Sequence, residues 1–190
     1  MKVLVTGATG FVGSHLMAKL DDVVVLSTNV LRAKSKHPEA KVYKWSASMP
    51  VPKEALEGVD AVVHLAGEPV AGKWTDEKKK AIRDSRVDGT RRIVEAIATA
   101  KQKPKVLVCA SAVGYYGSRA DEKLTESAEA GSGFLADVCR EWELEALRAE
   151  QFDVRVVRTR FGFVIGADGG AIPEMVTPFR WGLGAWFGSG

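Results

Sequence analysis

Three glycines directly after the first predicted strand constrain the fold of this chain more than any other feature. The run Thr6-Gly7-Ala8-Thr9-Gly10-Phe11-Val12-Gly13 joins a β-branched stretch to a helical pattern. In a strand–loop–helix unit, a first glycine permits a tight turn, a second lets the backbone approach a pyrophosphate, and a third allows close helix packing. The exposed N–H groups and the helix dipole then hold negative charge. The spacing predicts a pyrophosphate-binding loop; the alternative is a plain strand–helix turn.

Short apolar runs alternate with longer helical patterns along the rest of the chain. The runs are almost continuously apolar, which is typical of strands that are buried on both faces of a parallel sheet. This alternation predicts an α/β fold, a Rossmann-type doubly wound parallel sheet with helices on both faces. The predicted strands are 2–6, 23–27, 40–45, 61–65, 105–110 and 154–159, and the predicted helices are 11–20, 76–100 and 134–150.

Composition excludes several classes of protein. A net charge of +3 over 190 residues is too small to indicate a nucleic-acid partner. No apolar run is long enough to span a bilayer, and a strand that starts at Lys2 leaves no signal peptide before it. Cys109 and Cys139 form no disulfide framework. We therefore expect a soluble cytoplasmic protein with a small-molecule substrate and no membrane partner; nothing in the sequence indicates an oligomer.

The composition changes towards the end of the chain. After Thr159 the sequence becomes rich in glycine and aromatic residues, and it stops at Phe187-Gly188-Ser189-Gly190 without a closing element. We expect residues 1–165 to form the nucleotide-binding domain and residues 166–190 to begin a substrate-side lobe that is incomplete here.

The end of the second predicted strand bears on the choice of dinucleotide. An acidic residue at this place would bind the ribose 2′-hydroxyl of NAD. The chain has Ser27-Thr28-Asn29 there, with Arg32 and Lys34 close behind. This pattern favours NADP(H) over NAD(H), unless the two cations are only solvated loop charges.

A second glycine-containing segment, 67–74, approaches the pattern of a triphosphate-binding loop. That loop needs Ser or Thr after its lysine to bind Mg²⁺, and Trp74 stands there instead. We therefore expect a rigid loop at the carboxyl edge of the sheet. His64 lies nearby, but His15 and His37 give it no plausible metal geometry, so no metal site is predicted.

Several longer motifs carry a resemblance to a known family. They are TGATGFVG at 6–13, HLAGEP at 64–69, GKWT at 72–75, SRVDGT at 85–90, SAVGYYG at 111–117, FLADVCREWE at 134–143 and FRWGLG at 179–184. With these motifs in this order, the chain resembles the extended short-chain dehydrogenase/reductase superfamily. It is most similar to the atypical nucleoside-diphosphate-sugar-epimerase-like group within it, short-chain dehydrogenase family 39U.

The resemblance implies roles for individual residues. Ser111 would hydrogen-bond the substrate carbonyl, and Arg86 stands where the superfamily has a helical asparagine. Relatives often have Arg-Asn where this chain has Thr28-Asn29. The residues that would form the cofactor site are Gly7, Thr9, Gly10, Phe11, Val12 and Gly13 around the pyrophosphate, Thr28, Asn29 and Arg32 near the second strand, Leu65, Ala66 and Gly67 along the adenine and ribose, and Arg86.

The superfamily's catalytic pair is missing. Its Tyr-x-x-x-Lys motif places a proton-transferring tyrosine and a lysine on one helix face. Phe134 and Val138 occupy those two positions here. Tyr115 and Tyr116 remain as candidate acids, assisted by Arg86, unless they only form a turn that shapes the pocket; Ser111 likewise could simply bond the backbone.

Two hypotheses follow. The chain is either an NADP(H)-dependent oxidoreductase or epimerase acting on an unidentified carbonyl or hydroxyl substrate, or a catalytically silent dinucleotide sensor or partner-binding protein. Ser111 and the neighbouring aromatic residues support the enzyme, and the missing Tyr-x-x-x-Lys pair supports the sensor.

Overall fold

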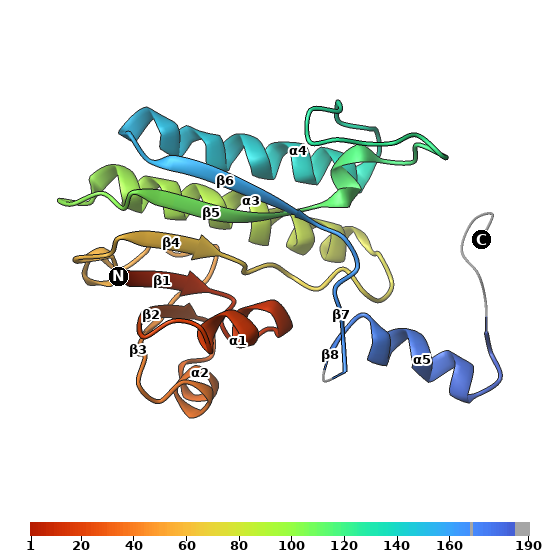
Figure 1. The fold of residues 1–190 in the computed structure, drawn as a ribbon, viewed down its shortest axis with the longest axis horizontal. Coiled ribbons are helices and arrows are strands. Elements are labelled where there is room, and N and C mark those ends of the chain that lie inside the picture. The colour runs from red at the N-terminus through yellow and green to blue at the C-terminus, as the bar shows by residue number, and fades with distance from the viewer. Residues whose placement is uncertain (168, 185–190) are drawn as a thin grey trace.

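A parallel six-stranded sheet organises the chain in the order β3-β2-β1-β4-β5-β6 (Figure 1). The computed structural model describes residues 1–167 and 169–184. The strands are β1 (Lys2–Thr6), β2 (Asp22–Ser27), β3 (Lys41–Lys44), β4 (Ala61–His64), β5 (Val106–Ala112) and β6 (Arg155–Phe161). All neighbouring pairs run parallel. The predicted Rossmann-type sheet is confirmed, with each strand within a few residues of its predicted bounds.

Helices cover both faces of the sheet. Alternate side chains of β1 show the division, since Val3 and Val5 pack in one apolar cluster and Leu4 packs in another. The first cluster includes residues of α1 (Phe11–Met17) and α2 (Val30–Lys36). The second includes residues of α3 (Asp76–Thr99) and α4 (Phe134–Leu147). Thr75 caps α3 by accepting a hydrogen bond from Lys78 N.

The structure adds short elements that the sequence patterns did not predict. They are α2 and the 3₁₀ turns η1 (Lys53–Leu56), η2 (Val113–Tyr116) and η3 (Arg148–Phe152), the last of which continues the line of α4. Helix α2 has only seven residues, too few to establish a hydrophobic period. Its visible signal is Asn29, whose side chain caps the helix by accepting from Arg32 N at 2.9 Å.

Beyond β6 the chain leaves the sheet. A two-stranded hairpin of β7 (Ile165–Gly166) and β8 (Gly169–Gly170) leads to α5 (Ile172–Arg180). The hairpin lies against the Phe11 ring, because a Cβ added at Gly169 or Gly166 would overlap that ring. The predicted domain boundary at residue 165 coincides with this departure but stays a prediction. The predicted aromatic end, 185–190, lies outside the described residues.

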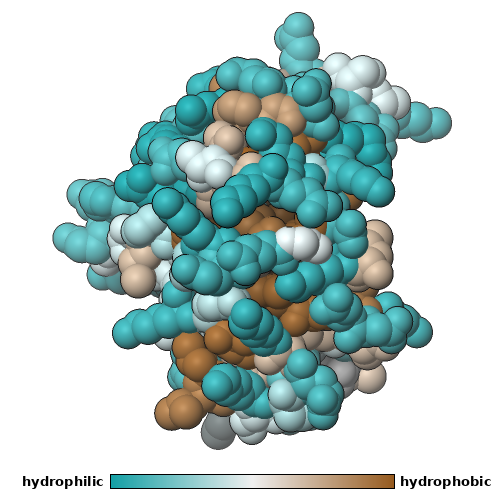
Figure 2. All heavy atoms as spheres, turned by 90° about the vertical axis from the view of Figure 1, so that its left-hand side faces the viewer, coloured by the Kyte–Doolittle hydropathy of each residue, from teal (hydrophilic) through white to brown (hydrophobic). Residues whose placement is uncertain are grey.

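The two edges of the sheet differ in character. The strands run towards the right of Figure 1, and the loops that follow β1 and β4 lie on that side. Figure 2 views the opposite edge, which is largely hydrophilic with apolar side chains between the charged ones. Within 1–167 and 169–184, no helix combines the length and apolar character needed to cross a bilayer. Ligands of open parallel sheets bind outside the carboxyl ends of the strands, so we expect a ligand site at this end of the sheet.

Candidate functional site

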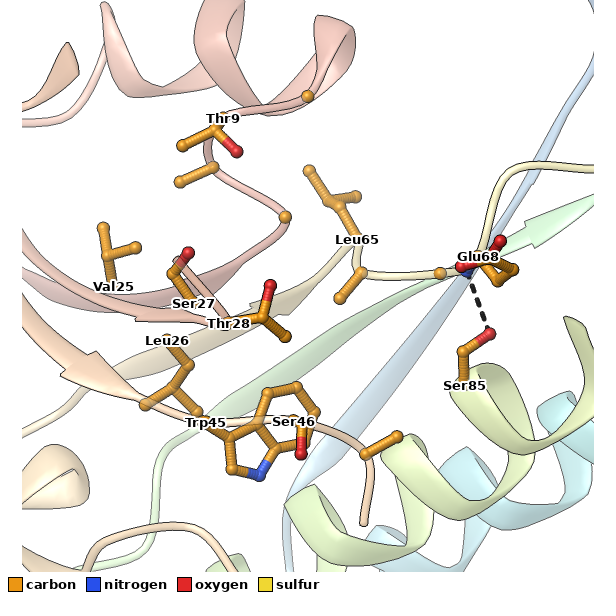
Figure 3. Close-up of a pocket in the computed structure, with 16 residues that line it drawn as sticks. Thr9, Val25, Leu26, Ser27, Thr28, Trp45, Ser46, Leu65, Glu68 and Ser85 are labelled. Atoms are coloured by element: carbon orange, nitrogen blue, oxygen red, sulfur yellow. Dashed lines mark hydrogen bonds between the residues drawn. The ribbon is translucent and has the colours of Figure 1, made fainter. Parts of the chain in front are cut away.

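A cavity of about 360 Å³ lies at this carboxyl edge (Figure 3). Five segments line it, namely the glycine loop after β1, the ends of β2, β3 and β4 with the residues that follow them, and α3 through Ser85. Predicted cofactor residues that line it are Gly7, Thr9, Gly10, Thr28, Leu65, Ala66 and Gly67. Lining residues that the sequence analysis did not assign to the cofactor site are Ala8, Val25, Leu26, Ser27, Trp45, Ser46, Ala47, Glu68 and Ser85. The structure therefore brings together loops that lie far apart in the sequence.

The glycine loop has the close backbone approaches that its spacing predicted. Gly7 has a φ of +72°, and a Cβ there would lie 2.8 Å from the Leu65 carbonyl. Gly10 N donates to Gly7 O at 3.0 Å, which closes the turn. At Gly13, in α1, a Cβ would overlap Gly7 O and lie 2.9 Å from Ala8 Cα. Glycine at these positions lets α1 start directly against the strand end, so that the amino end of the helix, at Gly10, lies at the cavity.

The hydroxyl of Thr6 fixes the opposite wall of the cavity. Thr6 Oγ1 accepts from Leu65 N and Ala66 N, each at 3.1 Å, and lies 2.7 Å from His64 Nδ1. Because the hydroxyl already accepts two N–H bonds, its proton is assigned to Nδ1. The imidazole then carries its own proton on Nε2, a fully buried atom without a hydrogen-bond partner in the described part of the chain. Burial, and secondarily the charge of Arg86, lower the pKa of His64 to about 4.

His64 should make stability depend on pH. Its pKa is about 4 when folded, against an ordinary value of 6.5. Between these values the unfolded chain binds a proton that the folded chain excludes, so stability falls as pH decreases. We expect a loss of about 2 kcal/mol between pH 7 and pH 5. Urea unfolding at both pH values measures it. His64→Asn, whose amide oxygen can still accept from Thr6, should lose this dependence of the unfolding free energy on pH. The control variant His15→Gln should keep it. The same loss of stability between pH 7 and pH 5 in all three proteins would contradict the assignment.

The two cations that the sequence analysis considered after β2, Arg32 and Lys34, do not line the cavity. Arg32 is exposed and is not among the residues that line the cavity. Two residues at the other end of α2 reach the glycine loop instead. Lys36 Nζ donates to Thr9 O at 3.4 Å, and His37 Nε2 lies 3.1 Å from Ala8 O. The sequence analysis missed both, since only the tertiary fold brings the end of α2 to this loop.

Arg86 supports the loop after β4 rather than a tyrosine. Its Nη1 donates to Glu68 O at 2.9 Å and to Ile82 O at 3.2 Å. The guanidinium also stacks over the Trp142 ring at 5.3 Å and closely approaches Gly67. Burial lowers the pKa of Arg86, while the Cys139 and Glu68 side chains oppose that shift. The predicted cofactor-site residue thus lies behind the cavity wall and holds it in place.

The candidate catalytic serine belongs to a buried polar cluster. Ser111 Oγ donates to Glu143 Oε1 at 2.6 Å. The carboxylate of Glu143 also accepts from Arg160 Nε and Nη2, both at 2.8 Å, and from Arg158 Nη1 at 3.1 Å. Burial alone would raise the pKa of Glu143, but the hydrogen bonds and charges of Arg160, Ser111 and Arg158 outweigh it and lower the pKa. Ser111 therefore points its proton at Glu143 in this arrangement.

Arg160 also contacts the two candidate tyrosines. Its guanidinium lies 3.6 Å from the Tyr115 ring centroid, and its Nη1 donates to Tyr116 Oη at 2.8 Å. The cation that the sequence analysis assigned to these rings, Arg86, is engaged elsewhere. Ser111, Tyr115 and Tyr116 are absent from the lining of the 360 Å³ cavity, so they form a separate cluster on β5 and η2.

The positions of the missing catalytic pair have packing roles. Phe134 packs edge to face against Trp74, with ring centroids 5.5 Å apart, and Val138 is buried. Neither side chain can exchange a proton. The helix that would carry the pair instead contributes Glu143 to the polar cluster.

Taken together, the parallel strand order, the glycine loop and the adjoining cavity define an NAD(P)-binding Rossmann domain. The chain matches the model of the NAD dependent epimerase/dehydratase family over residues 3–182, and it belongs to that family.

Individual relatives agree with this assignment. The chain is 40% identical over 197 residues to the chloroplastic epimerase family protein SDR39U1 homolog of Arabidopsis thaliana, covering 100% of this chain and 56% of that protein. It is 35% identical to the epimerase family protein YfhF of Bacillus subtilis, covering 100% of this chain and 63% of YfhF. The crystal structure of human epimerase family protein SDR39U1 (isoform 2) with NADPH superimposes with a TM-score of 0.80 at 32% identity, covering 100% of this chain and 63% of the human one. The chain thus spans less than two thirds of these relatives.

Proposed function

We propose that this chain is the cofactor-binding part of an NADP(H)-dependent oxidoreductase or epimerase that acts on a small carbonyl or hydroxyl substrate. The observation that carries the proposal is the cavity between the glycine loop and the end of β4. Its walls fit a dinucleotide, because Gly7 and Gly13 permit close backbone approaches that bring the start of α1, with its backbone N–H groups, to the cavity where a pyrophosphate would bind. The human relative described with NADPH supports the same choice of cofactor.

In this proposal, different residues of the chain have different roles in binding the cofactor and in the reaction. The glycine loop would hold the pyrophosphate, and Leu65, Ala66 and Gly67 would lie along the adenosine half. When bound, the nicotinamide would supply hydride exchange with the substrate. Tyr116 would hold the proton that accompanies it, since its oxygen accepts from Arg160 and its own O–H remains a donor. Ser111 would polarise the substrate carbonyl only if its hydroxyl turned away from Glu143.

That condition on Ser111 favours the second candidate function, a dinucleotide sensor without turnover. In the sensor, Ser111, Glu143 and Arg160 would serve only as a structural cluster. The Phe134 and Val138 substitutions of the usual catalytic pair are consistent with it. Both functions require dinucleotide binding, and only the enzyme requires hydride exchange with a substrate.

A binding titration tests the shared part of the two proposals. We expect NADPH to bind this chain more tightly than NADH, with nicotinamide fluorescence as the readout. Absence of binding by both dinucleotides would overturn both functions. A panel of carbonyl compounds with NADPH then separates them: turnover that falls in Tyr116→Phe supports the enzyme, and turnover unchanged in both Tyr116→Phe and Ser111→Ala contradicts the catalytic assignment.

A further inference from the structure

We propose that Lys36, at the carboxyl end of α2, supplies the positive charge that recognises the 2′-phosphate of NADP(H) in this chain. The inference rests on the proposed dinucleotide function and deepens it, because it names the residue that determines cofactor preference. It replaces the sequence-based assignment of this charge to Arg32 or Lys34.

The need for such a residue comes from the end of β2. In Rossmann domains the ribose 2′ position lies at the end of this strand, where an acidic residue selects NAD and a cation accommodates the phosphate of NADP. Here the strand ends in Ser27 and Thr28, which both line the cavity and carry no charge. The site therefore excludes neither dinucleotide through that strand, and a charge that discriminates between them has to come from another element.

Lys36 does not itself line the cavity, but it is an α2 cation that contacts a residue of the cavity wall. Its Nζ lies 3.4 Å from the carbonyl oxygen of Thr9, a residue of the cavity wall. Figure 3 shows Thr9 on the same side of the cavity as Ser27 and Thr28, away from Glu68 and Ser85. The Lys36 ammonium group, in contact with Thr9, thus lies beside the part of the cavity that the adenosine ribose would occupy.

The end of α2 is held in place rather than free to swing. His37 Nε2 lies 3.1 Å from Ala8 O, and His37 N donates to Ala33 O at 2.9 Å. The first contact joins the end of α2 to the glycine loop directly beside Lys36, and the second closes the last turn of the helix. The segment 30–37 contains Arg32, Lys34 and Lys36 and no acidic residue, so no carboxylate of this helix neutralises the ammonium group. A dianionic phosphate would replace the weak contact with Thr9 by a charge-assisted one.

Substitution of Lys36 with a matched control tests the inference. Lys36→Gln and Lys34→Gln remove one exposed charge each from the same helix. For Lys36→Gln we expect the Kd for NADPH to rise about tenfold and the Kd for NADH to change less than about twofold. Lys34→Gln should change both values less than about twofold, and Lys36→Arg should retain most of the preference for NADPH. The thermal unfolding midpoint of each variant shows that the fold is intact.

Other outcomes overturn the inference in distinguishable ways. Equal weakening of NADPH and NADH by Lys36→Gln would mean that the lysine supports the glycine loop and does not read the phosphate. No change in either Kd value in Lys36→Gln, or equal effects of Lys34→Gln and Lys36→Gln, would also contradict it. Failure of the unmodified chain to bind either dinucleotide would instead overturn the proposed function, on which this inference rests.

Discussion

Glu143→Gln should lower the free energy of unfolding by about 3 kcal/mol, the scale of a broken buried ion pair. Glu143 is 3% exposed, and its carboxylate accepts hydrogen bonds from Arg160, Arg158 and Ser111. A neutral amide would leave the Arg160 guanidinium, itself only 10% exposed, without its counter-charge. Urea unfolding followed by circular dichroism measures the loss.

A neighbouring glutamate on the same helix, paired with an arginine of α3, provides the control. Glu141 binds Arg83 at 2.6 Å, but the two side chains are 38% and 43% exposed. Glu141→Gln should therefore cost less than about 1 kcal/mol, because solvent screens the pair. If both substitutions cost the same, the burial of the Glu143 cluster would not carry the stability assigned to it.

The Glu143 cluster also predicts a response to acid. Its pKa is lowered in the folded chain, where burial opposes the shift and the hydrogen bonds and charges of Arg160, Ser111 and Arg158 outweigh it. The stabilisation is therefore present above the ordinary glutamate pKa and is lost as pH falls through the lowered folded value. This window lies below the His64 window, so the two contributions are separable in a series of unfolding curves.

Gly13→Ala should abolish measurable dinucleotide binding and also destabilise the chain by about 2 kcal/mol, a typical cost of overpacking. Alanine is a better helix former than glycine, so intrinsic propensity alone would predict a gain. The loss arises because the new Cβ would overlap Gly7 O and press on Ala8 Cα, which displaces the turn that faces the cavity. Binding is measured by NADPH fluorescence and stability by urea unfolding.

Gly162→Ala is a suitable comparison for Gly13→Ala. A Cβ at Gly162 would meet only Val113 Cγ1, at 4.0 Å, and the position follows β6, away from the glycine loop. We expect its binding and stability to match those of the unmodified chain. Retention of NADPH binding in Gly13→Ala would show that the loop tolerates the side chain and would contradict the role assigned to this glycine.

The sequence alone determined the strand–helix alternation, the parallel sheet and the glycine loop. These features depend on short stretches of sequence. Near-continuous apolar runs indicate strands, and the spacing of Gly7, Gly10 and Gly13 indicates a turn. It also predicted most of the cavity's glycine-loop and β4 residues. It did not predict α2 as a helix, because seven residues with one clear cap carry little periodic signal.

Only the tertiary structure decided which polar side chains meet. Lys36 and Thr9 are 27 positions apart, and Ser111 and Glu143 are 32 apart. No periodicity in the sequence reports such pairs, because they depend on how strands and helices pack across the sheet. The structure therefore placed Arg160, rather than Arg86, against Tyr115 and Tyr116, and it placed Lys36, rather than Arg32, against the glycine loop. Residue type and local spacing can be read directly from the sequence. Which side chain pairs with each charged group depends instead on the tertiary packing that buries the pair.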